Sequence, residues 1–313
     1  MKYPLRYPLL LPAVGLLCLV ACVLRTVACL TALDGFGYFP ASALPEASAY
    51  ILLGAALIAL LLPLFHKEPA VRPLLPSHPL ATLPTGMLAL CEVLLCTADA
   101  MARREAGAPL SAQPPMLRAV SVLLLVLGLI GAAYYVLCLA KREQVNEARA
   151  WCGMAAVLFC ALYAVYLYFN TALPLNATTK ITSQVAFLTF AVYLLQDVRL
   201  SLGKPCYRLH LALTLIAASV AAYAALPALI TYAVRGTIID HTLFETLFTL
   251  CFLLFALARL YALWQLPSDE PCTALLPCES AAAGATEESA EADEQTAEAA
   301  VGTPTDATEE ADA

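Results

Sequence analysis

The sequence predicts an all-α integral membrane protein, a polytopic bundle of about eight transmembrane helices followed by an acidic tail. Hydrophobic residues make up 61% of the 313 residues and charged residues only 13%, whereas a soluble domain carries roughly 25% charged residues. The apolar residues gather in long continuous runs, which suit helices rather than the alternating segments of a transmembrane barrel. The charge is divided along the chain: residues 1–266 carry 17 basic and 11 acidic residues, and residues 267–313 carry 13 acidic residues and no basic one.

Each helix is predicted from the length of its apolar run. A helix that crosses a hydrocarbon core of about 30 Å needs about 20 apolar residues. The third of the eight runs is the weakest, because Pro84, Glu92 and Asp99 interrupt it. The runs in order are 8–33, 47–65, 80–100, 116–140, 150–172, 180–202, 206–234 and 241–266.

The basic residues predict the orientation, because cytoplasmic loops carry an excess of Lys and Arg. With eight spans and the N-terminus inside, ten basic residues fall in inner segments and five in outer loops. If the third run does not span, every later loop changes side and the division becomes nine against six. The basic residues therefore favour eight spans with both termini cytoplasmic, in a plasma membrane or a bacterial inner membrane. The outer loop with Arg103, Arg104 and Arg118 fits this orientation less well.

Residues 267–313 consist mainly of Ala, Glu, Thr, Asp and Ser and contain no aromatic residue. Such a segment buries too little apolar area to offset its chain entropy, so we expect a disordered cytoplasmic tail. Its charge also allows an acidic tether that approaches a basic cytoplasmic protein or the inner basic loops. The expected partners are thus the lipid bilayer and a cytoplasmic protein bound through the tail, and no nucleic acid.

Four ionisable residues inside the runs form a candidate intramembrane polar cluster, because such residues are costly in lipid and normally face a partner inside the bundle. At 1.5 Å per residue, Glu92 lies roughly 18 Å from the inner end of its span and Arg25 roughly 25 Å from the start of its own. A long Arg side chain covers much of that difference, and we therefore expect Arg25 to pair with Glu92. Asp99 and Glu245 are further acidic partners, and Asp99 shares a helix face with Glu92 because it lies seven residues later.

Two functions of this cluster remain open. The residues can stabilise the packing of the helices or line a path for a solute or proton, and both functions require the same location inside the bundle. Only 13 of the 313 residues are Gly, so the broken helices typical of transporters are weakly indicated. Arg259 is expected to extend to the inner interface, and Asp197 with Arg199 to close the sixth span.

The sequence shows no signature of catalysis, a metal or a cofactor. Nine of the twelve cysteines lie inside apolar runs, no C-x-x-C occurs, and the four histidines are widely spaced, so no metal site or cofactor is expected. Hydrolase, metalloprotease, P-loop and dinucleotide motifs are missing, and we expect no enzyme. The sequence indicates a non-catalytic sensor, accessory or assembly component. The alternative is a small-solute or ion permease that uses an Arg25/Glu92 site.

Overall fold

The structure, a computed structural model, describes residues 9–40, 42–64, 79–105, 114–139, 147–169, 174, 176–202, 206–240 and 242–265. These residues form an all-α polytopic bundle of about eight spans, as predicted, and no strand occurs among them. The helices are α1 Leu10–Thr31, α2 Leu44–Leu64, α3 Pro79–Glu105, α4 Pro115–Leu139, α5 Glu147–Phe169, α6 Thr178–Ser201, α7 Tyr207–Arg235 and α8 Leu243–Gln265.

Seven of the described helices are long and apolar enough to cross a membrane. The remaining helix, α3, is 27 residues long but has a shorter apolar stretch, Thr82–Ala98. The weakness of the third predicted run is thus a property of its composition, because α3 is as long as its neighbours. Large apolar side chains also face outward, such as Leu16, Leu19 and Val23 on α1, as expected of helices whose surroundings are lipid.

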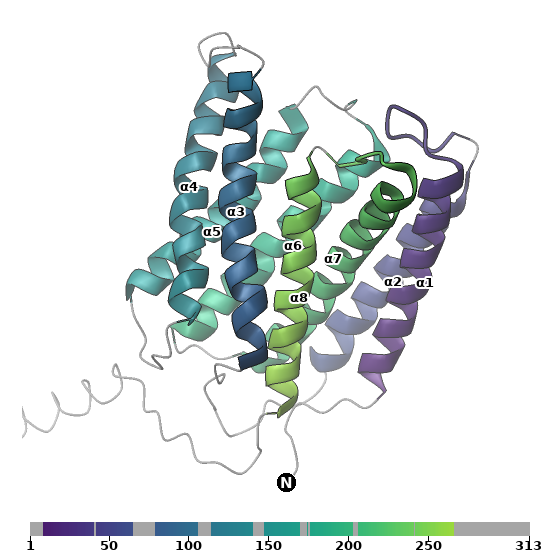
Figure 1. The fold of residues 1–313 in the computed structure, drawn as a ribbon. Helices are drawn as coiled ribbons and strands as arrows, with labels where there is room; N and C mark the ends of the chain where they lie inside the picture. Colours follow the sequence, from purple (N-terminus) through teal and green to yellow (C-terminus); the bar gives the residue numbers. More distant parts are fainter. Residues whose placement is uncertain are drawn as a thin grey trace, which may run out of the picture. The chain divides into compact units, whose positions relative to one another are not determined.

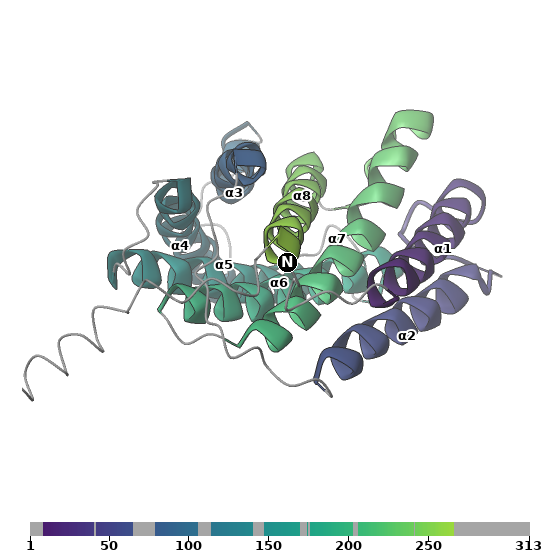
Figure 2. The same ribbon diagram turned by 90° about the horizontal axis from the view of Figure 1, so that it is seen from below.

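Helices α3 to α8 form a closed circuit of neighbours. Each packs against the next along the chain, and α8 packs in turn against α3. Helices α1 and α2 stand outside this circuit, packed against each other and against α7, on the side away from α3 and α4 (Figure 2). Successive helices run in opposite directions (Figure 1). We name the two ends of the bundle the Gln265 end, where α8 finishes, and the Glu105 end, where α3 finishes.

Aromatic rings fill the space inside the circuit. Phe187 and Phe190 on α6, and Phe248, Phe252 and Phe255 on α8, are all 0% exposed. Phe190 stacks on Phe252 with ring centroids 4.0 Å apart, and Phe187 stacks on Phe248 at 5.5 Å. Stacked and edge-on rings at such distances add to the favourable burial of apolar area. The interior is therefore closely packed between α6 and α8.

Close contact between α3, α4 and α5 depends on glycine in α4. A Cβ atom at Gly131 would lie 2.3 Å from Oε1 of Glu92 and 2.9 Å from Cα of Ala156, and one at Gly128 would lie 2.8 Å from Cβ of Cys96. Small residues allow helix backbones to approach closely in membranes. Gly131 thus makes room for the Glu92 carboxyl group.

The chain divides into two units, Met1–Pro271 and Cys272–Ala313, and all eight helices belong to the first. The predicted boundary between a bundle of residues 1–266 and a tail stays a prediction, because the described residues end at Gln265. The predicted acidic tail, residues 267–313, lies outside the described residues.

Candidate functional site

Arg25 lies in the second half of α1 and is 3% exposed. Its Nη1 donates a hydrogen bond of 2.8 Å to the Thr182 hydroxyl on α6, and its Cζ lies 4.5 Å from the centroid of the Tyr223 ring on α7. A guanidinium over an aromatic face is attracted by the ring's quadrupole. The Tyr223 hydroxyl is itself hydrogen-bonded to that of Ser48 on α2, at 2.8 Å. Arg25 therefore connects α1, α6 and α7 near the Glu105 end.

The predicted ion pair between Arg25 and Glu92 is not formed. Both oxygens of the Glu92 carboxyl are buried without a hydrogen-bond partner, while the Arg25 guanidinium turns toward Thr182 and Tyr223. The reason is the order of the helices, because α1 packs on α2 and α7 whereas α3 packs between α4 and α8. The depth of two residues along their spans does not make them neighbours.

Glu92 itself is 0% exposed near the middle of α3. The polar side chain that interacts with its carboxyl group is Tyr135 of α4. The Tyr135 hydroxyl is also buried, and its geometry completes no regular hydrogen bond. The thiols of Cys96 and Cys160 lie within electrostatic range. Glu92 and Tyr135 are thus two buried polar groups that lie close enough to interact, although the geometry of neither group completes a regular hydrogen bond.

Glu245 and Asp240 lie at the Glu105 end. Glu245, in the first turn of α8, is 1% exposed and accepts a hydrogen bond of 3.2 Å from the Tyr163 hydroxyl of α5. Asp240, in the loop before α8, accepts a hydrogen bond of 2.5 Å from the Thr246 hydroxyl. Burial raises the pKa of the Asp240 carboxyl above 3.8, and the Thr246 hydrogen bond and the charge of Arg25 oppose this rise. Asp240 thus lies within electrostatic range of Arg25, and the predicted grouping of Glu245 with Arg25 stays a prediction.

Asp99 belongs to α3, seven residues after Glu92, but its side chain lies outside the described part of the structure. Its predicted place in the cluster stays a prediction.

A second polar cluster occurs at the Gln265 end, and we define the Asp197 cluster as Asp197, Tyr134, Arg259 and His210. Asp197 Oδ2 accepts a hydrogen bond of 2.5 Å from the Tyr134 hydroxyl and lies 3.4 Å from Arg259 Nη2. Its Oδ1 lies 3.9 Å from His210 Nε2. The four residues come from α6, α4, α8 and α7, and each is at most 9% exposed. One carboxylate therefore connects four helices.

Further donors surround the Asp197 cluster. Tyr193 on α6 stacks on the His210 ring at 5.5 Å, and Arg149 on α5 lies 5.9 Å from the Tyr134 ring. The Tyr193 hydroxyl and both ring nitrogens of His210 are buried without a hydrogen-bond partner. Polar atoms of His210 and Tyr193 thus lie beside the cluster without completing a hydrogen bond.

Sequence reasoning did not find the Asp197 cluster, because it treated Asp197 as a helix end and Arg259 as an exposed interfacial residue. The structure corrects the interpretation of Arg259, which is 9% exposed and paired with Asp197. A usable signal was present. Arg259 is the one basic residue of α8, and Asp197, His210 and Arg259 all lie within two turns of helix ends that meet at the same side of the bundle.

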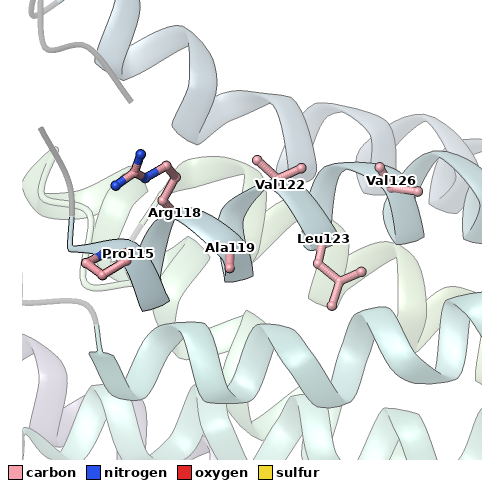
Figure 3. Close-up of a pocket in the computed structure, with 6 residues that line it drawn as sticks. All are labelled: Pro115, Arg118, Ala119, Val122, Leu123 and Val126. Carbon is pink, nitrogen blue, oxygen red and sulfur yellow. The ribbon is translucent and has the colours of Figure 1, made fainter. Parts of the chain in front are cut away.

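A groove on the described surface runs along α4 near the Glu105 end and has a volume of about 710 Å³. Its lining comes from α4 alone and is apolar except for Arg118 (Figure 3). An open apolar helix face of this kind is expected to contact lipid chains. The lining residues are Pro115, Arg118, Ala119, Val122, Leu123 and Val126.

No protein family, no curated protein and no solved structure matches the chain.

Proposed function

We propose that the protein is a non-catalytic integral membrane protein that acts as a sensor, accessory or assembly component. The observation that supports this proposal is the aromatic packing inside the helix circuit, where stacked pairs such as Phe190 and Phe252 are 0% exposed. A solute that crossed between α6 and α8 would have to displace these rings, and closely packed interiors resist such changes. The packing therefore favours a bundle whose helices move together over one that opens a solute path between α6 and α8.

The Asp197 cluster offers a means of response. It joins α4, α6, α7 and α8 at the Gln265 end, which is also the end from which residues 267–313 continue the chain. With both termini cytoplasmic, as the distribution of basic residues favours, this cluster would lie at the cytoplasmic face. A change in its contacts would then alter the helix ends that carry the acidic segment to its partner.

Removal of residues 267–313 tests this proposal. We expect the shortened protein, purified in lipid nanodiscs, to keep the thermal unfolding temperature of the full chain but to lose a cytoplasmic protein that the full chain captures. A chain of full length with the 13 acidic residues of this segment changed to Asn or Gln is the matched control for charge. Equal capture by all three chains would contradict the proposal.

A second candidate, a permease for a small solute or ion, is favoured by one observation. The Glu92 carboxyl lies near the middle of α3 with neither oxygen hydrogen-bonded, and intramembrane acidic residues often mark transport paths. In reconstituted vesicles with a trapped ion-sensitive dye, Glu92→Gln should then abolish flux. Arg199→Gln, which changes an exposed residue of α6, should leave flux intact.

A further inference from the structure

The surroundings of Glu92 allow only a very small ligand. Gly131 already lacks a side chain, and a Cβ atom there would fall 2.3 Å from Oε1 of Glu92. The backbone of α5 closes the same space, with the nitrogen of Ala156 3.1 Å from that Cβ position. The carboxyl group therefore fills the room that the glycine provides.

The chemistry of the neighbouring groups also argues against a metal cation. Hard cations such as Mg²⁺ and Ca²⁺ need six or more oxygen ligands. Around Glu92 the structure provides one hydroxyl, that of Tyr135, and the thiols of Cys96 and Cys160. No Lys, Arg or His of the described helices acts on the carboxyl as a counter-ion. The titratable groups that interact with it are Cys96 of α3, Tyr135 of α4 and Cys160 of α5.

We propose that Glu92 is a proton-binding site in the interior of the bundle, and that the bound proton joins its carboxyl group to the Tyr135 hydroxyl. Proton binding converts the carboxylate to a carboxylic acid, which can donate one hydrogen bond and accept others. A hydrogen bond that the acid donates to the Tyr135 hydroxyl oxygen satisfies two buried groups whose present geometry completes no regular hydrogen bond. It also removes an isolated negative charge from an apolar medium, where such a charge is costly.

Proton binding at Glu92 goes beyond the proposed function, because Glu92 lies in α3 and the proposed function depends on residues 267–313. It holds whether or not residues 267–313 bind a partner, and the deletion experiment above does not test it.

Infrared spectroscopy of the whole protein in lipid nanodiscs tests the inference. A carboxylic acid has a carbonyl stretching band that a carboxylate lacks, and hydrogen bonding to the carbonyl group shifts that band. We expect the wild-type protein at neutral pH to show such a band, and Glu92→Gln to lose it. Glu245→Gln, which changes another buried acidic residue, should keep the band.

Two adjacent tyrosines provide a test substitution and its matched control. Tyr135→Phe removes the hydroxyl that faces Glu92 and should shift the band, whereas Tyr134→Phe removes the hydroxyl bound to Asp197 and should leave it in place. A band that persists unchanged in Glu92→Gln would overturn the inference. If Glu92→Gln does not accumulate, a band that is unmoved in Tyr135→Phe overturns it instead, since the glutamate is intact in that variant.

Discussion

The Tyr134 hydroxyl donates a hydrogen bond of 2.5 Å to the Asp197 carboxylate, and both side chains are buried. Arg259 approaches the same carboxylate oxygen at 3.4 Å. A buried carboxylate is tolerated when charged or hydrogen-bonding groups satisfy it. Tyr134 and Arg259 together meet that condition for Asp197, and the contact holds α4 and α8 against α6.

Replacement of Asp197 should destabilise the bundle strongly. Asp197→Leu leaves the Arg259 guanidinium buried without its carboxylate, and loss of one partner of a buried ion pair costs about 3–5 kcal/mol. We expect a lower thermal unfolding temperature in nanodiscs. Arg199→Gln, two residues along α6 but exposed, should change it little.

A double substitution separates the unpaired charge from lost packing. Because an apolar pair of similar volume can replace a buried ion pair with little loss, Asp197→Leu combined with Arg259→Leu should recover a large part of the stability lost in Asp197→Leu. Additive losses in the double variant would show that the ion pair does not account for the effect.

Gly131→Ala should also destabilise the protein. Its Cβ atom would lie 2.3 Å from Glu92 Oε1 and 2.9 Å from the Ala156 backbone, and overpacking of an interior costs about 1–3 kcal/mol. Gly54→Ala is the matched control, because no atom lies within 4 Å of the added Cβ on α2. Thermal unfolding measures both variants, and equal unfolding temperatures for the two would contradict the close approach of α4 to α3 and α5.

The neighbouring positions of α3 and α8 can be tested by cross-linking. The Cys91 and Cys251 sulfur atoms lie 3.6 Å apart. Membrane-permeant iodine should oxidise these two thiols to one disulfide, reducing one I₂ to two iodide ions and releasing two protons. Mass spectrometry of the cross-linked peptides should detect the loss of two hydrogen atoms, and Cys251→Ser should abolish it. Failure to form this disulfide while other thiols react would place α8 away from α3.

Asp240 predicts a pH dependence of stability. Because burial raises the pKa of this carboxyl in the folded protein above 3.8, its protonated form is favoured by folding. The resulting stability is present below the unfolded pKa and is lost as the pH rises through the folded pKa. Asp240→Asn should therefore gain stability relative to the wild type as the pH rises from acid to neutral, measured by thermal unfolding at each pH. A difference that shrinks over this range would contradict the assigned direction.

The apolar runs predicted the helices well, because the length of a run and the thickness of a bilayer are both set by simple dimensions. The partners of the buried charges were harder to predict from the sequence. The rise per residue gave the depths of Arg25 and Glu92 along the bundle, but not the order of helices around it. That order depends on packing details such as the glycines of α4, whose contacts involve residues far apart in the sequence.

The most direct test is whether α3 crosses the membrane, because α3 decides whether the number of spans is even. Reporter fusions at residue 1 and after residue 313, each active in only one compartment, give the location of both ends of the chain. Eight spans predict that both ends lie in the same compartment, and the distribution of basic residues predicts that this compartment is the cytoplasm. Ends in opposite compartments would remove α3 from the set of spans and contradict the placement of Glu92 within the membrane.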